Sequence, residues 1–242
     1  MSQQIVSTSN LKVWAIIPAA GSGSRFSKVE LKQYQQIADK TVLEHTVSRL
    51  KTLPLLGCVL AIGEQDTFVQ TLNFAKDTDT YFCQGGSERV YSVLNALNYL
   101  SEFANPNDWV LVHDAARPCV SMDSLTALWQ CVEQSQQAAI LATPVRDTLK
   151  RVVDGVEINE TVDRAQLWQE QTPQMAPLVI LKQSIEQALA QNAVITDEAS
   201  ALEFVGHRVN IVMGRADNIK ITYPDDLSLA QLILGAQDAS KK

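Results

Sequence analysis

Val13-Trp-Ala-Ile-Ile-Pro-Ala-Ala-Gly-Ser-Gly-Ser-Arg-Phe26 is the stretch that decides the fold, because it has the pattern of a buried strand running into an anion-binding loop. An apolar run ends at Pro18, and alanines and glycines follow it. Small residues let backbone N–H groups approach an anion closely, and successive turn amides form a concave nest for phosphate oxygens. Arg25 and Lys32 follow, so two cations accompany the loop.

Two familiar phosphate-binding motifs do not fit this loop. The Walker A motif ends in Gly-Lys-Ser/Thr, whereas the loop has Gly23-Ser24-Arg25. The dinucleotide fingerprint needs a third glycine where Phe26 stands. From the loop alone, a phosphate site and an ordinary tight turn after a strand are equally supported.

The composition is typical of a soluble globular protein. Of 242 residues, 46% are hydrophobic and 19% are charged, which gives one domain over residues 1–242 ample material for a core. No apolar stretch is long enough to span a bilayer, and the polar N-terminus has no signal-peptide pattern. The net charge of −7 argues against a nucleic-acid or membrane surface but is compatible with a small anionic ligand. The four cysteines lack metal-ligand spacing, so we expect free thiols in a reducing cytosol.

Strand-like and helix-like segments alternate along most of the chain. Thr41-Val-Leu-Glu44 is a capping box that predicts the start of a helix. The alternation predicts an α/β fold with a doubly wound, mostly parallel sheet and helices on both faces. Further predicted strands cover 56–62, 81–83, 109–112, 138–145, 209–213 and 219–222, and predicted helices cover 65–75, 90–100, 122–134, 197–204 and 224–235.

The alternation breaks between Thr148 and Thr161, where Asp154-Gly155 separates two alternating runs. This pattern predicts a β-hairpin. The hairpin either caps an edge of the sheet or projects toward a second subunit. The pattern alone favours capping.

Three motifs follow predicted strands, and ligands of open parallel sheets bind beyond the carboxyl ends of the strands. They are the opening loop, Gly85-Gly-Ser-Glu-Arg89 with Ser92, and His113-Asp-Ala-Ala-Arg-Pro118. Asp114 suits Mg²⁺, which takes one or two carboxylates together with phosphate oxygens. A lone aspartate there is more often a cap, but the adjacent Arg117 and the opening loop favour a metal and anion site. Ser87 and Ser92 either contact a base or ribose or cap the next helix, and capping is favoured.

Four residues further along the chain stand next to turns or strand ends, and single cations in such places are usually solvated. The four are Arg164, Thr172, Thr196 and Lys220, and Thr172 belongs to a predicted rigid polar turn over Gln171-Thr-Pro-Gln174.

Together the motifs resemble the 2-C-methyl-D-erythritol 4-phosphate cytidylyltransferases over nearly the whole chain, from Val13 to about Leu234. The matching blocks are Pro18-Ala-Ala-Gly-x-Gly-x-Arg25, Lys32-Gln-Tyr34, Gly85-Gly-x-Glu-Arg89 with Ser92, His113-Asp-Ala-Ala-Arg-Pro118, Arg146-Asp-Thr148, Val162-Asp-Arg164, Gln171-Thr-Pro-Gln174, Thr196-Asp-Glu-Ala-Ser200 and Asp217-Asn-Ile-Lys220. The resemblance implies a Rossmann-like sheet of the nucleotide-diphospho-sugar transferase type. It also implies transfer of CMP from CTP to methylerythritol phosphate with Mg²⁺, in the non-mevalonate route to isoprenoid precursors.

The resemblance also assigns expected roles to residues. Arg25, Lys32, Arg164 and Lys220 would be catalytic, because cations neutralise the two anions that must meet in phosphoryl-type transfer. Asp114 would hold Mg²⁺. The residues expected at CTP are Ala19, Ala20, Gly21, Gly23, Gly86, Ser87 and Ser92, and those expected at the acceptor are Asp114, Ala115, Arg117, Thr148, Arg164, Thr172, Thr196 and Lys220.

In the family that the chain resembles, the hairpin is an arm exchanged between the subunits of a homodimer. The resemblance therefore implies a dimerisation arm over residues 147–164, with Arg164 serving the neighbouring subunit, which reverses the capping expectation. Between a bacterial protein and a processed plastid protein, the short polar N-terminus favours a bacterial protein of the cytoplasm.

Two departures and two alternatives accompany the resemblance. Leu31 stands where a proline is common, and Ser87 stands where an acidic residue is common. The first alternative is a ribitol-5-phosphate cytidylyltransferase, but Ala19-Ala20-Gly21 and Asp114-Ala-Ala-Arg117 favour methylerythritol phosphate. The second is a CTP-sensing module without turnover, in which the retained cations would have no purpose.

Overall fold

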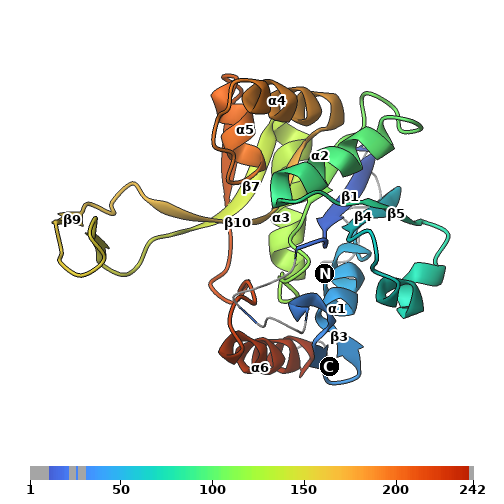
Figure 1. Ribbon diagram of the computed structural model, residues 1–242, viewed down its shortest axis with the longest axis horizontal. Helices are drawn as coiled ribbons and strands as arrows, with labels where there is room; N and C mark the ends of the chain where they lie inside the picture. The colour runs from blue at the N-terminus through green and yellow to red at the C-terminus, as the bar shows by residue number, and fades with distance from the viewer. Residues whose placement is uncertain (1–10, 22–25, 27–30, 240–242) are drawn as a thin grey trace.

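The computed structural model describes residues 11–21, 26 and 31–239, and this part of the chain forms a central sheet with helices on both faces (Figure 1). The sheet has seven strands, and its spatial order is β11-β7-β10-β6-β1-β4-β5. The strands are β1 (Val13–Pro18), β4 (Gly57–Ile62), β5 (Thr80–Gln84), β6 (Trp109–Val112), β7 (Ala138–Pro144), β10 (Trp168–Pro177) and β11 (Val209–Met213). All are parallel except β10, so the predicted mostly parallel α/β fold is confirmed.

The helices follow the local signals of the sequence. The capping box is present, because Thr41 Oγ1 accepts from Glu44 N and the Glu44 carboxylate accepts from Thr41 N. The helices are α1 (Val42–Leu50), α2 (Arg89–Leu100), α3 (Met122–Ser135), α4 (Leu178–Ala190), α5 (Glu198–Phe204) and α6 (Asp225–Ala239). Short 3₁₀ turns are η2 (Lys32–Tyr34), η3 (Phe68–Thr71) and η4 (Asn73–Lys76), and β2 (Gln36–Ile37) pairs with β3 (Lys40–Thr41). None of the helices in the described ranges is long and apolar enough to cross a membrane.

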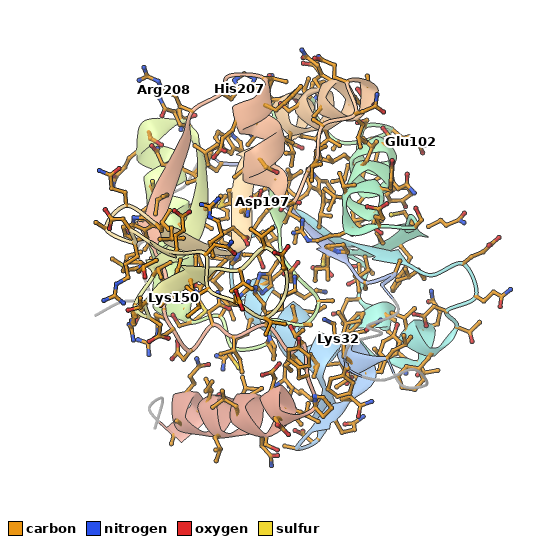
Figure 2. The ribbon with its side chains drawn as sticks, turned by 60° about the vertical axis from the view of Figure 1, so that its left-hand side comes forward. Lys32, Glu102, Lys150, Asp197, His207 and Arg208 are labelled. Carbon is orange, nitrogen blue, oxygen red and sulfur yellow. The ribbon has the colours of Figure 1, made fainter. Side chains whose placement is uncertain are left out.

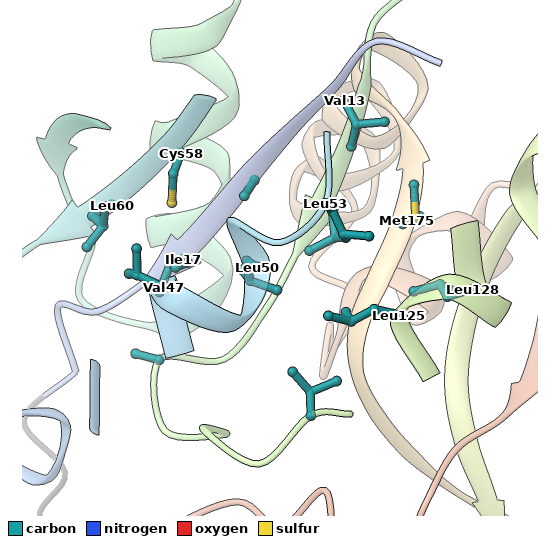
Figure 3. Packing of buried hydrophobic residues seen from close by; sticks show 14 of the residues in the cluster. Val13, Ile17, Val47, Leu50, Leu53, Cys58, Leu60, Leu125, Leu128 and Met175 are labelled. Atoms are coloured by element: carbon teal, nitrogen blue, oxygen red, sulfur yellow. The ribbon is translucent and has the colours of Figure 1, made fainter. Parts of the chain in front are cut away.

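The core lies on both faces of the sheet because successive strand residues point to opposite sides. On β1, Val13, Ala15 and Ile17 pack on one face with residues of α1 and α3, as Figure 3 shows for Val13, Ile17, Val47 and Leu50. Trp14 and Ile16 pack on the other face with residues of α2, α4 and α5. A strand buried on both faces explains the continuous apolar run at the start of the chain.

Several predicted elements are corrected. Gln171–Gln174 is no polar turn but part of β10, whose pairing with β7 shifts register between Gln171 and Gln174. The predicted helix over 65–75 is the two 3₁₀ turns η3 and η4, and the predicted strand over 219–222 is irregular. The last helix runs past Gly235 to Ala239. Each misjudged segment is short or polar, so its conformation is decided by distant partners rather than by its own periodicity.

The predicted hairpin is present but does not cap the sheet. β8 (Leu149–Arg151) and β9 (Glu160–Val162) form a separate two-stranded sheet, so the expectation that the hairpin covers an edge is wrong. Figure 1 shows this hairpin projecting away from the rest of the molecule. Its connection spans 152–159, and Gly155 there has a φ of +82°, which suits glycine. We call residues 147–164 the hairpin arm.

Candidate active site

One pocket gathers the predicted motifs at the carboxyl ends of β1, β5 and β6. Its volume is about 330 Å³. It is lined by Pro18, Ala19, Ala20, Gly21, Lys32, Gln33, Gly86, Ser87, Glu88, Arg89, Ser92, Asp114, Ala115, Ala116, Lys220 and Thr222. Figure 2 shows Lys32 on the blue, N-terminal part of the chain and Asp197 on the orange part near α5. The parallel strands bring residues from both halves of the sequence to this edge.

The loop after β1 is held from both sides. Ala19 N donates to Ala61 O at 2.8 Å, and the buried Gln33 side chain donates to Ala19 O at 3.0 Å. These bonds fix the backbone of Ala19, and Ala20 and Gly21 follow it along the wall of the pocket. Gly23 and Arg25, both predicted at the site, lie outside the described residues.

The loop after β5 meets the first loop through Gly85. A Cβ atom on Gly85 would lie 2.3 Å from the Cβ of Ala20, so only glycine permits this approach. Ser92 Oγ accepts from Gly86 N at 3.0 Å and faces Glu88 O at 3.2 Å, so Ser92 shapes the loop. Helix α2 begins after Glu88 without a side-chain cap, so the expectation that Ser87 or Ser92 caps it is wrong.

Three cations surround the buried Asp114 carboxylate. Arg89 Nε donates to Oδ1 at 2.8 Å, while Lys220 Nζ at 2.8 Å and Arg117 Nε at 3.5 Å face Oδ2. Burial by itself would raise the pKa of Asp114, but Arg89, Lys220 and Arg117 outweigh burial and hold the pKa well below its usual range. Asp114 is therefore ionised at any pH at which the protein works.

Arg89 joins Asp114 to a second carboxylate. Its Nη1 and Nη2 atoms donate to Glu198 Oε1 at 2.7 Å and Oε2 at 3.0 Å, and its Nε atom faces Asp114. Burial would lower the pKa of Arg89, but Glu198 and Asp114 raise it above its ordinary value. The three residues form a charged chain from α5 through α2 to the loop after β6.

Behind Asp114, a second chain of hydrogen bonds has one consistent direction. His113 Nε2 lies 3.0 Å from Arg117 O and therefore carries the proton, so Nδ1 accepts from Thr172 Oγ1 at 2.9 Å. Thr172 Oγ1 in turn accepts from Asp114 N at 3.0 Å. Burial lowers the pKa of His113 to about 4, so the ring is neutral near pH 7.

The two pocket lysines are far apart in sequence but are linked through the segment over 219–222. Lys32 Nζ donates to Ile221 O at 2.9 Å, directly after Lys220, whose Nζ lies on Asp114. The irregular segment over 219–222 thus supplies Lys220 to the pocket and holds the Lys32 amine, and both lysines line the pocket.

The remaining predicted residues do not line this pocket. Arg117 is buried beside it and donates to Asn218 O at 2.8 Å, and Thr172 is buried behind Asp114. Thr196 is exposed at a small neighbouring cavity that Glu198 also lines. Thr148 and Arg164 are exposed on the hairpin arm.

Arg89, Glu198 and Gln33 are the residues that sequence reasoning left without a role. Arg89 and Glu198 stand inside two of the matching blocks, Gly85-Gly-x-Glu-Arg89 and Thr196-Asp-Glu-Ala-Ser200. Their location in these blocks was the signal that the sequence offered. No local pattern indicates that the two side chains pair in the fold.

Asp114 is the predicted magnesium ligand, and its two oxygens face Arg89, Lys220 and Arg117 in this structure. Among the residues that the structure describes, no group of three His, Cys, Asp or Glu side chains could hold a metal ion alone. A Mg²⁺ ion at this carboxylate would need phosphate oxygens and water to complete its shell, as is usual for magnesium sites that hold a nucleotide.

Comparisons with known proteins agree on one family. The model of the 2-C-methyl-D-erythritol 4-phosphate cytidylyltransferase family (IspD) matches residues 13–236. A cytidylyltransferase of this name from Acinetobacter baumannii is 64% identical over 231 residues, covering 96% of this chain and 97% of the relative. One from Vibrio vulnificus is 46% identical and covers 94% and 96%. The crystal structure of the Francisella tularensis enzyme superposes with a TM-score of 0.80 at 36% identity, covering 92% of this chain and 99% of that one.

Proposed function

The chain belongs to the 2-C-methyl-D-erythritol 4-phosphate cytidylyltransferase family, and on that premise we propose how its pocket carries out the reaction. The enzyme transfers CMP from CTP to 2-C-methyl-D-erythritol 4-phosphate, in the non-mevalonate route to isoprenoid precursors. The observation that carries our proposal is the convergence of the Ala19–Gly21 backbone, Lys32 and Lys220 on one pocket around Asp114.

In the reaction, an acceptor phosphate oxygen attacks the α-phosphorus of CTP. The new P–O bond forms as the bond to the leaving pyrophosphate breaks. Both partners are anions, so their approach is opposed by repulsion, and positioning with electrostatic stabilisation provides most of the catalysis. We assign the triphosphate to the amides of Ala19, Ala20 and Gly21, and the developing charge to Lys32, Arg25 and Lys220.

The cytidine lies, in this proposal, against the loop of Gly86, Ser87 and Ser92. Ser87 is exposed at the pocket, whereas Ser92 is buried and acts through the shape of the loop. Asp114 would hold Mg²⁺, which would supply positive charge to the phosphate oxygens.

The acceptor lies, in this proposal, beside Asp114, Ala115 and Lys220. Arg117 and Thr172 support it from behind, because both touch Asp114 rather than the open pocket. Thr196 would contact the acceptor from the side of α5.

The hairpin arm, in this proposal, completes the site of a second subunit in a homodimer. Its exposed Val153, Val156 and Ile158 side chains, at 69%, 88% and 61% exposure, are apolar surface that a partner would cover. Thr148 and Arg164, exposed on the same arm, would then reach the neighbour's acceptor. Two copies that exchange the same arm would form a symmetric, self-complementary interface, as most homodimers do.

We also propose that the enzyme works in the bacterial cytoplasm without a nucleic-acid or membrane partner. Its four cysteines are free thiols, as is usual in a reducing compartment, and the relatives described above are bacterial. The net charge of −7 disfavours an anionic polymer or surface as partner.

The deciding experiment measures pyrophosphate release from CTP and Mg²⁺ with methylerythritol phosphate, with ribitol 5-phosphate or with no acceptor. We expect release with methylerythritol phosphate alone. Lys32→Ala should lower kcat by about 10²–10³-fold, because one preorganised charge donor is lost. Lys76→Ala, a change at an exposed lysine on η4, is the matched control and should keep wild-type turnover. Equal losses of turnover and CTP affinity in Lys32→Ala would contradict its assignment to the transferred phosphate.

A complementation experiment tests the exchanged arm. Inactive Lys32→Ala and Arg164→Ala subunits are mixed and allowed to exchange. If Arg164 acts on the neighbour, each mixed dimer regains one intact site and activity returns. Activity that stays at the level of the separate variants would place Arg164 in its own subunit's site.

A further inference from the structure

Glu198 has a buried charge that the reaction itself does not explain. Its side chain is 3% exposed, and both of its oxygens are taken by Arg89. It lines a small cavity next to Thr196 rather than the pocket assigned to CTP. Burying a charge is costly unless a partner compensates it, and such pairs are weak contributors to stability compared with apolar packing.

Helix α5 does not need Glu198 to hold its place. Gln174 accepts from Ala199 N at 2.8 Å and donates to Asp197 Oδ2 at 2.9 Å, so β10 anchors the first turn of α5. Asp197 and Ser200 add a capping box at the same turn. The Glu198 carboxylate is therefore left to act on Arg89.

The geometry of Arg89 shows what Glu198 does to it. With Nη1 and Nη2 both on Glu198, the guanidinium plane is fixed and only the Nε edge faces Asp114, at 2.8 Å. Without Glu198, the two terminal nitrogens would turn toward Asp114 or toward the phosphates in the pocket. The bidentate pairing of Arg89 with Glu198 therefore decides which edge of the guanidinium faces Asp114.

We propose that Glu198 is a positioning residue for the transfer reaction, holding Arg89 in the one orientation that fixes the Asp114 carboxylate at the pocket. This inference rests on the proposed function of Asp114. It assigns to α5 two separable tasks. Gln174 and the cap place Thr196, while Glu198 places Asp114 through Arg89.

The test is the Glu198→Gln variant, which keeps the size of the side chain but puts an amide NH₂ against a guanidinium nitrogen. We expect kcat to fall by about 10- to 100-fold, the range for one charge-assisted hydrogen bond. The KM for CTP should change less than about 3-fold, because the Ala19 backbone assigned to the triphosphate keeps its bonds to Ala61 and Gln33. Glu203→Gln, at an exposed position on the same helix, is the matched control and should behave as wild type.

A double-mutant cycle separates positioning from a merely structural role. Arg89→Lys keeps the charge but cannot bridge both carboxylates, so it should lose kcat as Glu198→Gln does. If Glu198 acts through Arg89, the double variant should lose no more than about 3-fold beyond the worse single variant. The inference would be overturned if the kcat losses of the two single variants multiply in the double variant. It would also be overturned by a Glu198→Gln kcat within 2-fold of wild type.

Two further readouts keep the outcome decisive. Melting temperatures show whether the variants are folded. If Glu198→Gln does not fold, Arg89→Lys alone is the test, and full activity of Arg89→Lys overturns the inference. Wild type and Lys32→Ala are assayed in parallel. A silent wild type would overturn the proposed function and this inference with it, whereas an active wild type that Glu198→Gln matches would overturn only the inference.

Discussion

The pocket and the hairpin arm each contain an arginine–carboxylate pair of nearly equal length in very different surroundings. Arg89 and Asp114 meet at 2.8 Å with side-chain exposures of 26% and 8%, while Arg151 and Glu160 meet at 2.7 Å with exposures of 61% and 57%. The distance alone therefore does not determine how much an ion pair contributes to stability. Water screens the pair on the arm, whereas removing one partner of the pocket pair leaves a largely buried charge with fewer compensating partners.

The same contrast holds for apolar residues. β1 is covered by helices on both faces, while Val153 and Val156 on the arm are exposed to solvent. A two-stranded hairpin is marginally stable at best without such cover. The pocket thus lies within the packed part of the chain, whereas the described chain provides no cover for the apolar side chains of the arm.

The largest expected effect is on the free energy of unfolding of Asp114→Asn. It should fall by about 3–5 kcal/mol, because the buried Arg117 and the half-buried Arg89 are each left with one charge partner fewer. Glu160→Gln on the arm should cost less than about 1 kcal/mol. Urea unfolding of both variants measures the difference, and equal losses would break the comparison.

A second prediction concerns pH and the buried His113. Its pKa is lowered from 6.5 to about 4 in the folded protein, so below pH 6.5 the unfolded chain binds a proton that the folded protein does not. The free energy of unfolding should therefore fall by about 3 kcal/mol as the pH drops from 6.5 to 4. His113→Asn should flatten this slope in a pH series of urea unfolding. An unchanged slope would assign the pH dependence to other groups.

A third prediction concerns Thr172. Thr172→Val leaves Asp114 N and His113 Nδ1 without their partner, so the free energy of unfolding should drop by about 1–3 kcal/mol. Thr172→Ser keeps the hydroxyl and should retain most of the wild-type stability. Thermal unfolding of the pair tests this, and equal melting temperatures for Val and Ser would rule out the hydrogen-bonded role.

The smallest change in the free energy of unfolding of the protomer is expected for substitutions on the hairpin arm. Val156→Asp combined with Ile158→Asp should change the free energy of unfolding of the protomer by no more than about 0.5 kcal/mol, since both side chains are already exposed. The same change should weaken the proposed dimer. Sedimentation of wild type and variant would show this, and an unaltered association would mean that the arm tip takes no part in assembly.

Much of the fold was predictable from local patterns. The capping box at Thr41 and the strand that ends at Pro18 are written within a few neighbouring residues, and both are present. β10 was missed because its polar Gln171 and Gln174 resemble a turn. They lie in a strand because β6 and β7 pair with it on either side.

The candidate site divides in the same way. Ala19, Gly86, Lys32 and Asp114 were predicted from their motifs, and all of them line one pocket. Thr172 was expected at the acceptor but lies behind Asp114, because β10 runs antiparallel beside β6 and directs this side chain toward His113.

The sequence by itself determined the class of fold, the loop of small residues after β1 and the residue types that line the pocket, since those signals lie within short stretches of chain. Only the tertiary structure decided that Glu198 reaches Arg89, that Lys32 reaches Ile221 and that the hairpin arm leaves the sheet uncapped. The physical reason is that these contacts depend on the order of the strands and on burial. Both are properties of packing between distant segments, which no local pattern encodes.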